Sequence, residues 1–305
     1  MRHGGDLRPA VEAYGIAAED WLDLSTGINP HPFTSGPDCR DSAALTDRRL
    51  PDPAQLQSLL AAARSAYNVP ADLAVCAAPE TEILIRMQPW LMTGDTALLP
   101  TTYRSYREAW SAAGRSIQVH AGTGFGTLPP ATSIVLVNPN NPDGRVIDRK
   151  TLIAGAQSRR APGRLIVDEA FADAHPGISL VPDLGAADPV IILKSFGKFH
   201  GLAGLRLGCA ALTDTGWQTE MRLQLADEAE QLDAILTSTG LEVIGGTVLF
   251  RLVRHPWAAE LQDHLARNGI WVRIFDEAPG LVRIGLPGQP AAMERFRQAL
   301  GGFPA

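Results

Sequence analysis

Short runs of apolar residues recur through the middle of this 305-residue chain, and they limit the folds open to it more than any other feature. The runs span residues 97–99, 134–137, 165–167, 190–193 and 205–212, with helical stretches or loops between them. Strands that are apolar on both faces are typical of parallel sheets covered by helices on both sides. The pattern therefore predicts an α/β fold with a mostly parallel sheet wrapped in helices.

Helical patterns lie on either side of this predicted sheet. Asp52 and Pro53 suit the cap and first turn of a helix, and residues 217–236 have the apolar spacing of one long amphipathic helix. We expect three regions: an N-terminal arm (1–40) that contributes to the small domain, a large domain (41–215), and a linker helix with a small α+β domain (216–305). Strand-like and helix-like segments alternate in that last region, at 248–253, 258–266, 270–274, 281–284 and 291–300.

The charge and the cysteines argue against several classes of protein. The chain has 27 Lys and Arg against 33 Asp and Glu, with no basic runs, so we expect no nucleic-acid partner. No stretch approaches the roughly 18 apolar residues of a membrane span, so we expect no membrane partner either. Cys39, Cys76 and Cys209 are scattered, which favours free thiols over a disulfide framework or a metal site. These features indicate a cytoplasmic protein.

One segment, directly after the apolar run 190–193, gathers residues with clear chemical uses. Ser195, Lys198 and Arg206 can place an amine and two phosphate ligands at the end of a buried strand. Lysine occurs at only two other positions, Lys150 and Lys194. We expect Lys194 to be a solvated or capping side chain. An ordinary exposed lysine is the alternative reading of Lys198, and the rarity of lysine argues against it.

The spacing of Ser195, Lys198 and Arg206, with glycines before the arginine, resembles the lysine signature of the pyridoxal-phosphate (PLP) enzymes of the aspartate-aminotransferase fold. The resemblance implies a large domain with a mostly parallel sheet, a small α+β C-terminal domain and PLP as cofactor. It makes Lys198 the catalytic residue that holds PLP as a Schiff base. Ser195 and Arg206 would then bind the cofactor phosphate.

Four further positions match cofactor-binding motifs of that family. Asp168, which follows the run 165–167, would be catalytic by pairing with the protonated pyridine nitrogen, although an aspartate here also suits a helix N-cap. Asn141 lies in a turn that resembles N-P-N-N-P-T-G, which assigns it to the phenolic oxygen of the cofactor. Tyr103 would stack on the ring, with a core tyrosine as the alternative. Thr81 would contact the phosphate at a helix N-terminus.

Three positions depart from the family pattern. Phe171 stands where many relatives have a tyrosine that contacts the phenolic oxygen, and Leu50 replaces a tyrosine that reaches a neighbouring subunit's phosphate. The loop before Thr81 lacks the usual glycine and carries Glu80. These departures bear on cofactor affinity.

The two ends of the chain indicate the reaction, which the cofactor motifs alone leave open. The segments around His3, Gly4 and Asn29, with Arg273 and Arg283, resemble the threonine-phosphate decarboxylases of cobalamin biosynthesis. The resemblance implies that these five residues bind the anionic groups of the substrate, for which arginine is well suited. For the two arginines, surface ion pairing is the alternative.

That resemblance implies decarboxylation of L-threonine O-3-phosphate to (R)-1-amino-2-propanol O-2-phosphate, and it implies a homodimer. Two other functions fit the same cofactor motifs. One is a histidinol-phosphate-type aminotransferase. The other is a weakly catalytic partner protein with the same fold.

Overall fold

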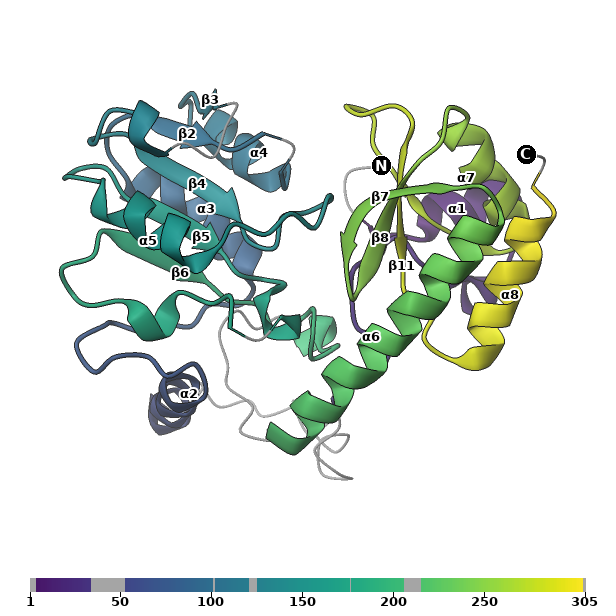
Figure 1. Ribbon diagram of the computed structural model, residues 1–305, viewed down its shortest axis with the longest axis horizontal. Coiled ribbons are helices and arrows are strands. Elements are labelled where there is room, and N and C mark those ends of the chain that lie inside the picture. Colours follow the sequence, from purple (N-terminus) through teal and green to yellow (C-terminus); the bar gives the residue numbers. More distant parts are fainter. Residues whose placement is uncertain are drawn as a thin grey trace. The chain divides into compact units, whose positions relative to one another are not determined.

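The computed structural model describes residues 4–33, 53–100, 102–120, 125–175, 177–205 and 215–303 (Figure 1). The chain divides into two compact units. The small unit comprises Met1–His31, Asn141–Arg145 and Thr219–Ala305. The large unit comprises Pro32–Asn140 and Val146–Gln218.

A parallel sheet of five strands forms the centre of the large unit, in the order β3-β2-β4-β5-β6. The predicted runs 134–137, 165–167 and 190–193 coincide with β4, β5 and β6, and the run 97–99 overlaps β2, so the predicted parallel sheet is confirmed. The run 205–212 lies outside the described residues except for Leu205. The strands are β2 (Thr96–Leu98), β3 (Gln118–Val119), β4 (Ser133–Val137), β5 (Leu165–Asp168) and β6 (Val190–Leu193).

Alternate residues of the central strands pack on opposite faces of this sheet. Ile134 of β4 packs with Leu152 of α5 on one face, and Val135 packs with Ile85 of α3 and Trp110 of α4 on the other. Side chains alternate along a strand, so a run without polar residues requires cover on both faces, which the helices supply. The helices of this unit are α2 (Pro53–Ala66), α3 (Thr81–Leu91), α4 (Ser105–Ala112) and α5 (Arg149–Gln157). Short 3-10 turns are η4 (Phe125–Thr127), η5 (Ala172–Ala174), η6 (Val181–Asp183) and η7 (Ala203–Leu205).

An antiparallel sheet in the order β10-β11-β8-β7 organises the small unit, and a second, two-stranded parallel sheet pairs β1 of the N-terminal arm with β9. The strands are β1 (Leu22–Asp23), β7 (Glu242–Thr247), β8 (Phe250–Arg254), β9 (Ile270–Trp271), β10 (Arg273–Ile274) and β11 (Leu281–Gly285). The helices are α1 (Arg8–Tyr14), η1 (Ala18–Asp20), α7 (Ala258–Arg267) and α8 (Pro290–Gly301).

Two details of the small unit differ from the sequence prediction. The predicted strand 270–274 is divided between β9 and β10, which pair in different sheets. The strand β7 was not predicted, because Gly245 and Gly246 interrupt its apolar pattern. Both glycines are required by close backbone contacts: a Cβ at Gly245 would lie 2.2 Å from the carbonyl oxygen of Asp143, and one at Gly246 would lie 2.3 Å from that of Phe250.

The long helix predicted for residues 217–236 is confirmed as α6 (Thr215–Ser238). Met221, Leu225, Leu232 and Leu236, which define its predicted apolar side, are all buried. Within the described part of the chain, none of the helices is both long enough and apolar enough to cross a membrane. Cys76 is exposed with a free thiol; Cys39 and Cys209 lie outside the described residues.

Candidate functional site

Residues that could take part in catalysis or binding lie near the carboxyl ends of three neighbouring strands of the large unit. Asp168 ends β5, and in the register of the sheet it stands between Val137 at the end of β4 and Leu193 at the end of β6. The segment that carries Lys198 begins directly after Leu193. In open parallel sheets, ligands bind at this edge. The topology therefore brings together two predicted catalytic residues that are 30 positions apart in the sequence.

Asp168 is almost completely buried, with 3% of its surface exposed. Burial raises the pKa of this carboxyl group, although the backbone N–H of Ala170, the hydroxyl of Tyr106 and the charge of Lys198 act in the opposite direction. Ala170 N donates to Oδ1 at 3.0 Å, and Tyr106 Oη donates to Oδ2 at 2.9 Å. These two bonds fix the orientation of the carboxyl group. A buried carboxylate held in this way is suited to pairing with a cationic ring nitrogen.

Tyr106 is a residue of the site that the sequence reasoning did not assign. Its ring is fully buried, and its pKa is raised well above the usual value by burial and by the neighbouring charge of Asp168. The hydroxyl therefore stays protonated and donates to Asp168. It was part of the segment from Thr102 to Tyr106, in which only Tyr103 was given a role.

Lys198 lies on the loop after β6, and its side chain is half-buried. Its Nζ is 5.8 Å from the centre of the Phe171 ring. The loop turns tightly, because Gly201 N donates to the Lys198 carbonyl oxygen at 3.1 Å and a Cβ at Gly197 would lie 3.1 Å from the Cα of Ala203. An aromatic wall on one side and a tight turn restrict the positions that the Lys198 amine can reach.

The other residues of the lysine signature are only partly described. The Ser195 hydroxyl accepts a hydrogen bond from Gly197 N at 3.4 Å, so it contributes to the turn before Lys198. Arg206 lies outside the described residues, and its predicted role as a phosphate ligand remains a prediction.

Thr81 is the first residue of α3, at the edge of the sheet where the strands end. Its buried hydroxyl donates to the carbonyl oxygen of Lys194 at 3.1 Å. The first N–H groups of a helix have no partner within the helix and favour an anion. The start of α3 is therefore a suitable place for a phosphate group.

Glu80, directly before this helix, adopts a backbone conformation that favours glycine. Its φ is +92°, and a side chain is strained there. The same residue places a negative charge beside the free N–H groups of α3. The lack of the usual glycine, noted from the sequence, thus has two structural consequences at one position.

The structure bears on the core alternative for Tyr103, and its stacking on the cofactor ring stays a prediction. It is half-buried and packs against the core cluster that contains Ile85 and Trp110. The neighbouring Thr102 donates from Oγ1 to Oδ1 of Asn140 at 2.7 Å, which joins the loop after β2 to the loop after β4.

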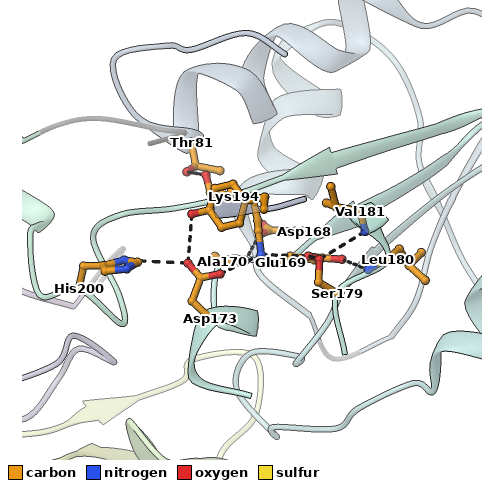
Figure 2. A network of polar contacts seen from close by, with 11 residues as sticks. Thr81, Asp168, Glu169, Ala170, Asp173, Ser179, Leu180, Val181, Lys194 and His200 are labelled. Carbon is orange, nitrogen blue, oxygen red and sulfur yellow. Dashed lines mark hydrogen bonds and ion pairs between the residues drawn. The ribbon is translucent and has the colours of Figure 1, made fainter. Parts of the chain in front are cut away.

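The expectation for Lys194 is wrong. Only 7% of its side chain is exposed, and its Nζ lies 2.9 Å from Asp173 Oδ1 and 3.1 Å from Glu169 Oε2 (Figure 2). The sequence contained one sign of this arrangement: Glu169, directly after Asp168, is a second carboxylate near the end of β5, and it could serve as the partner of a buried lysine. A lysine at the end of a buried strand needs such a partner to keep its charge.

In the small unit, the two predicted substrate-binding arginines stand directly opposite one another. Arg273 of β10 and Arg283 of β11 are partners in the antiparallel register, and each is 7% exposed. Directly opposed residues share one face of the sheet, and opposed like charges destabilise it. Buried positions rule out the surface ion pairs that were the alternative. Two guanidinium groups on one face of a sheet are suited to bind an anionic group.

Asn141 belongs to the small unit, where Arg283 fixes its side chain. Arg283 Nη1 donates to Asn141 Oδ1 at 2.8 Å, and Nη2 donates to the carbonyl oxygen of Ser25 at 2.5 Å. With Oδ1 used as an acceptor, the NH₂ group of Asn141 is the part suited to bind a ligand oxygen. The backbone of this segment is held by a bond from Gly246 N to Asp143 O at 3.0 Å.

The N-terminal arm packs on the same part of the small unit through Ser25. Gly5 N donates to Ser25 Oγ at 2.9 Å, and a Cβ at Gly4 would lie 2.2 Å from the Ser25 carbonyl oxygen, so only glycine fits there. Asn29 is 2% exposed, and its Oδ1 accepts from His31 N at 2.8 Å. His3 lies outside the described residues. Ser25, which the sequence reasoning left without a role, thus connects Gly4 and Gly5 to Arg283.

Comparison with known proteins agrees with this arrangement. The profile of the family described as "Aminotransferase class I and II" matches residues 65–217. The chain is 35% identical to a threonine-phosphate decarboxylase of Sinorhizobium sp, over 98% of this chain and 97% of that protein. It is also 35% identical to the threonine-phosphate decarboxylase of Pseudomonas aeruginosa, over 99% and 98% of the two chains. The solved histidinol-phosphate aminotransferase of Sinorhizobium meliloti, in complex with pyridoxal-5'-phosphate, has the same fold, with a TM-score of 0.81, 20% identity, and coverage of 97% of this chain and 93% of that one.

Proposed function

Because the chain belongs to the class I and II aminotransferase family, we propose that it is a PLP-dependent decarboxylase that converts L-threonine O-3-phosphate to (R)-1-amino-2-propanol O-2-phosphate. The substrate loses its α-carboxylate as CO₂ and takes up one proton at Cα. The observation that carries this proposal is the placement of a buried Asp168 at the end of β5 and of a half-buried Lys198 on the loop after the neighbouring strand β6. The relatives that are named for this reaction match nearly the full length of the chain.

The residues of the large unit fit the cofactor. Asp168 has the burial and the fixed orientation needed to hold the ring nitrogen. Thr81 and the first N–H groups of α3 would hold the phosphate, together with Ser195 and Arg206. Lys198 would bind the cofactor covalently through Nζ, Tyr103 would contact the ring face, and Asn141 would bind the phenolic oxygen.

When bound, PLP supplies an electron sink that makes the bonds at the substrate Cα labile. Asp168 contributes by holding a proton on the ring nitrogen, which a buried carboxylate does more effectively than an exposed one. The Nζ of Lys198 would be placed to donate the proton that Cα takes up in place of the lost CO₂.

The residues of the small unit select the substrate. Threonine phosphate carries a carboxylate and a phosphate, and Arg273 and Arg283 form an opposed pair of buried cations that such a substrate would neutralise. Gly4 and Asn29 would complete the anion site with His3. A substrate with two anionic groups is therefore favoured over a neutral amino acid.

We further propose that the protein is a cytoplasmic homodimer that serves cobalamin biosynthesis. Four large apolar side chains of α3 support the dimer, since Ile83, Met87, Trp90 and Leu91 are 41–73% exposed. The scattered cysteines support a reducing compartment. The place in cobalamin biosynthesis follows from the proposed product.

The test is to incubate the purified protein, Lys198→Ala and the control Lys150→Ala with PLP and L-threonine O-3-phosphate, while recording the absorbance of the lysine-bound cofactor and the product together. We expect aminopropanol phosphate from the wild type and the control, and a loss of at least about 1,000-fold in Lys198→Ala. Bound cofactor without this product, but with amino-group transfer to 2-oxoglutarate, would identify an aminotransferase. No lysine-bound cofactor at all would indicate a weakly catalytic partner protein.

A further inference from the structure

Four positions before the proposed cofactor lysine, the chain carries a second buried lysine that the reaction does not use. The Nζ of Lys194 is 2.9 Å from Asp173 Oδ1 and 3.1 Å from Glu169 Oε2, and the three side chains are 7%, 9% and 0% exposed (Figure 2). Its ammonium group also lies 4.6 Å from the centre of the Tyr67 ring. Burying an ammonium group between two carboxylates costs desolvation free energy, which is offset only when each charged group has hydrogen-bond partners.

Neighbouring groups satisfy both carboxylates. Glu169 accepts from Ser179 Oγ at 2.6 Å and from Leu180 N at 2.9 Å, which ties it to the loop before η6. Asp173 accepts from the Tyr67 hydroxyl at 3.3 Å, and its Oδ2 lies 4.0 Å from Nδ1 of the buried His200. The cluster thus has one ammonium, two carboxylates and an imidazole, with a net charge of −1 when His200 is neutral.

The cluster joins the same segments that carry the proposed cofactor contacts. Glu169 follows Asp168 directly, and its backbone N–H donates to the Leu193 carbonyl oxygen at 2.8 Å. Lys194 begins the loop that leads to Lys198, and its carbonyl oxygen accepts from Thr81 at the start of α3. Figure 2 shows Thr81, Glu169 and Asp173 around Lys194, with Asp168 beside them. Movement of Lys194 would therefore disturb Asp168, Lys198 and Thr81 together.

The same contacts hold Lys194 in its charged form. Burial alone would lower the pKa of Lys194, but the charges and hydrogen bonds of Asp173 and Glu169 outweigh it and raise the pKa to about 12. A lysine that is protonated at neutral pH has no free electron pair with which to attack a carbonyl carbon. Lys194 therefore serves as a permanent cation between its two carboxylate partners.

We propose that Lys194 is a positioning residue, which clamps Glu169 and Asp173 so that Lys198, Asp168 and the start of α3 hold PLP in a reactive geometry. This inference rests on the proposed function for its catalytic consequence, but not for the effect on cofactor binding. Because catalytic groups must be held closely, small displacements of these three segments would slow the reaction.

The test compares Lys194→Arg, Lys194→Met and the double variant Lys194→Met/Asp173→Asn with the wild type. Lys194→Arg keeps the cation and its two partners, whereas Lys194→Met leaves two buried carboxylates without a cation and could prevent folding. The double variant removes the clamp but keeps the net charge of the cluster at −1. Lys150→Met, an exposed lysine on α5, is the matched control.

Three quantities are measured: the dissociation constant of PLP, the pH at which the absorbance of the lysine-bound cofactor changes, and kcat and KM for L-threonine O-3-phosphate. In the double variant we expect PLP binding and kcat to fall by about tenfold or more, the absorbance midpoint to shift, and KM to change by less than about twofold, since Arg273 and Arg283 are untouched. Lys194→Arg should stay within about threefold of the wild type, and Lys150→Met should be unchanged.

A double variant that folds and binds PLP with wild-type affinity and an unchanged absorbance midpoint would overturn the inference and leave Lys194 a purely structural residue. The proposed function fails differently: the wild type itself would bind PLP but release no CO₂ from threonine phosphate. In that case the loss of PLP affinity in the double variant would still support the positioning role.

Discussion

At the scale of single residues, Asp168 places function in conflict with stability. Burial raises its pKa, so the folded protein binds a proton at this carboxyl group more tightly than the unfolded chain does. The stabilising contribution is present in full below the ordinary pKa of 3.8 and is lost as the pH rises through the higher folded-state value. Once ionised, at a pH above the folded-state pKa, the group therefore destabilises the cofactor-free protein.

We expect Asp168→Asn to raise the thermal unfolding midpoint of the cofactor-free protein at pH 7 by a few degrees, because a neutral amide removes the buried charge. The same variant should bind PLP more weakly, since the ring nitrogen loses its anionic partner. Unfolding followed between pH 4 and pH 8 should show the difference from wild type grow with pH. Asp227→Asn, which changes an exposed carboxylate on α6, is the control; equal destabilisation of both variants would contradict the argument.

Glu80 is a second residue that is poorly suited to its position, because the backbone there favours glycine and the nearby start of α3 favours an anionic ligand. We expect Glu80→Gly to stabilise the cofactor-free protein by about 1 kcal/mol, because glycine adopts φ +92° without strain. It should also tighten PLP binding by a few-fold, since a negative charge is removed from the start of α3.

Glu80→Ala separates these two effects, because it removes the charge and keeps the strained backbone. Urea unfolding and PLP titration of both variants would measure them. If PLP affinity is the same with glutamate, alanine and glycine at this position, the start of α3 does not hold the cofactor phosphate.

At the scale of secondary structure, α3 buries one face in the core of the large unit and exposes apolar side chains on the other. Its first residue, Thr81, contacts the loop of Lys194, and Ile85 is buried in the core. The opposite face carries the apolar group formed by Ile83, Met87, Trp90 and Leu91. Their spacing of three and four residues places them along one side of the helix, as expected for a surface that another protein chain covers.

We expect Trp90→Glu/Leu91→Glu to convert the proposed homodimer to a monomer, as measured by sedimentation equilibrium. The charges would have to be buried in the interface, where they have no partners. Leu223→Glu on α6 is a matched control, because Leu223 is 69% exposed and, among the residues that the structure describes, α6 carries no other exposed large apolar side chain. A double variant that sediments as a dimer would show that α3 does not form the interface.

At the scale of the whole molecule, the proposed ligand contacts are divided between the two units. Of the proposed cofactor residues, Lys198, Asp168 and Thr81 belong to the large unit and Asn141 to the small unit, which also holds Arg273 and Arg283. The cofactor should therefore stabilise mainly the large unit and the substrate mainly the small unit, since a ligand stabilises the structure that it binds.

Hydrogen exchange measures this difference directly. We expect PLP to slow exchange in residues 81–85, 165–171 and 194–200, and threonine phosphate to slow exchange further in β10 and β11. With PLP at about 100 times its dissociation constant, the stabilisation should approach 2.7 kcal/mol. Lys198→Ala should lose most of the first effect. Protection by threonine phosphate that spares Arg273 and Arg283 would contradict their role as anion ligands.

Much of the architecture was predictable because it follows from local patterns. Apolar runs without polar residues require a sheet that is covered on both faces, and the strands β4, β5 and β6 have that pattern. The regular apolar spacing of α6 likewise predicts one long helix. The identities and spacing of Ser195, Lys198 and Asp168 indicated the chemistry, because few residue types can supply an amine and a fixed carboxylate.

Other features depend on contacts between distant residues, which no local pattern contains. The backbone of Asp143, far away in the sequence, requires the glycine at position 245 of β7, and the split between β9 and β10 depends on their separate partners. The sequence by itself determined the sheet, the long helix and the residues that carry the chemistry. Only the tertiary structure decided that Lys194 is buried between Glu169 and Asp173 and that Arg273 faces Arg283, because burial and charge pairing are set by which strands become neighbours.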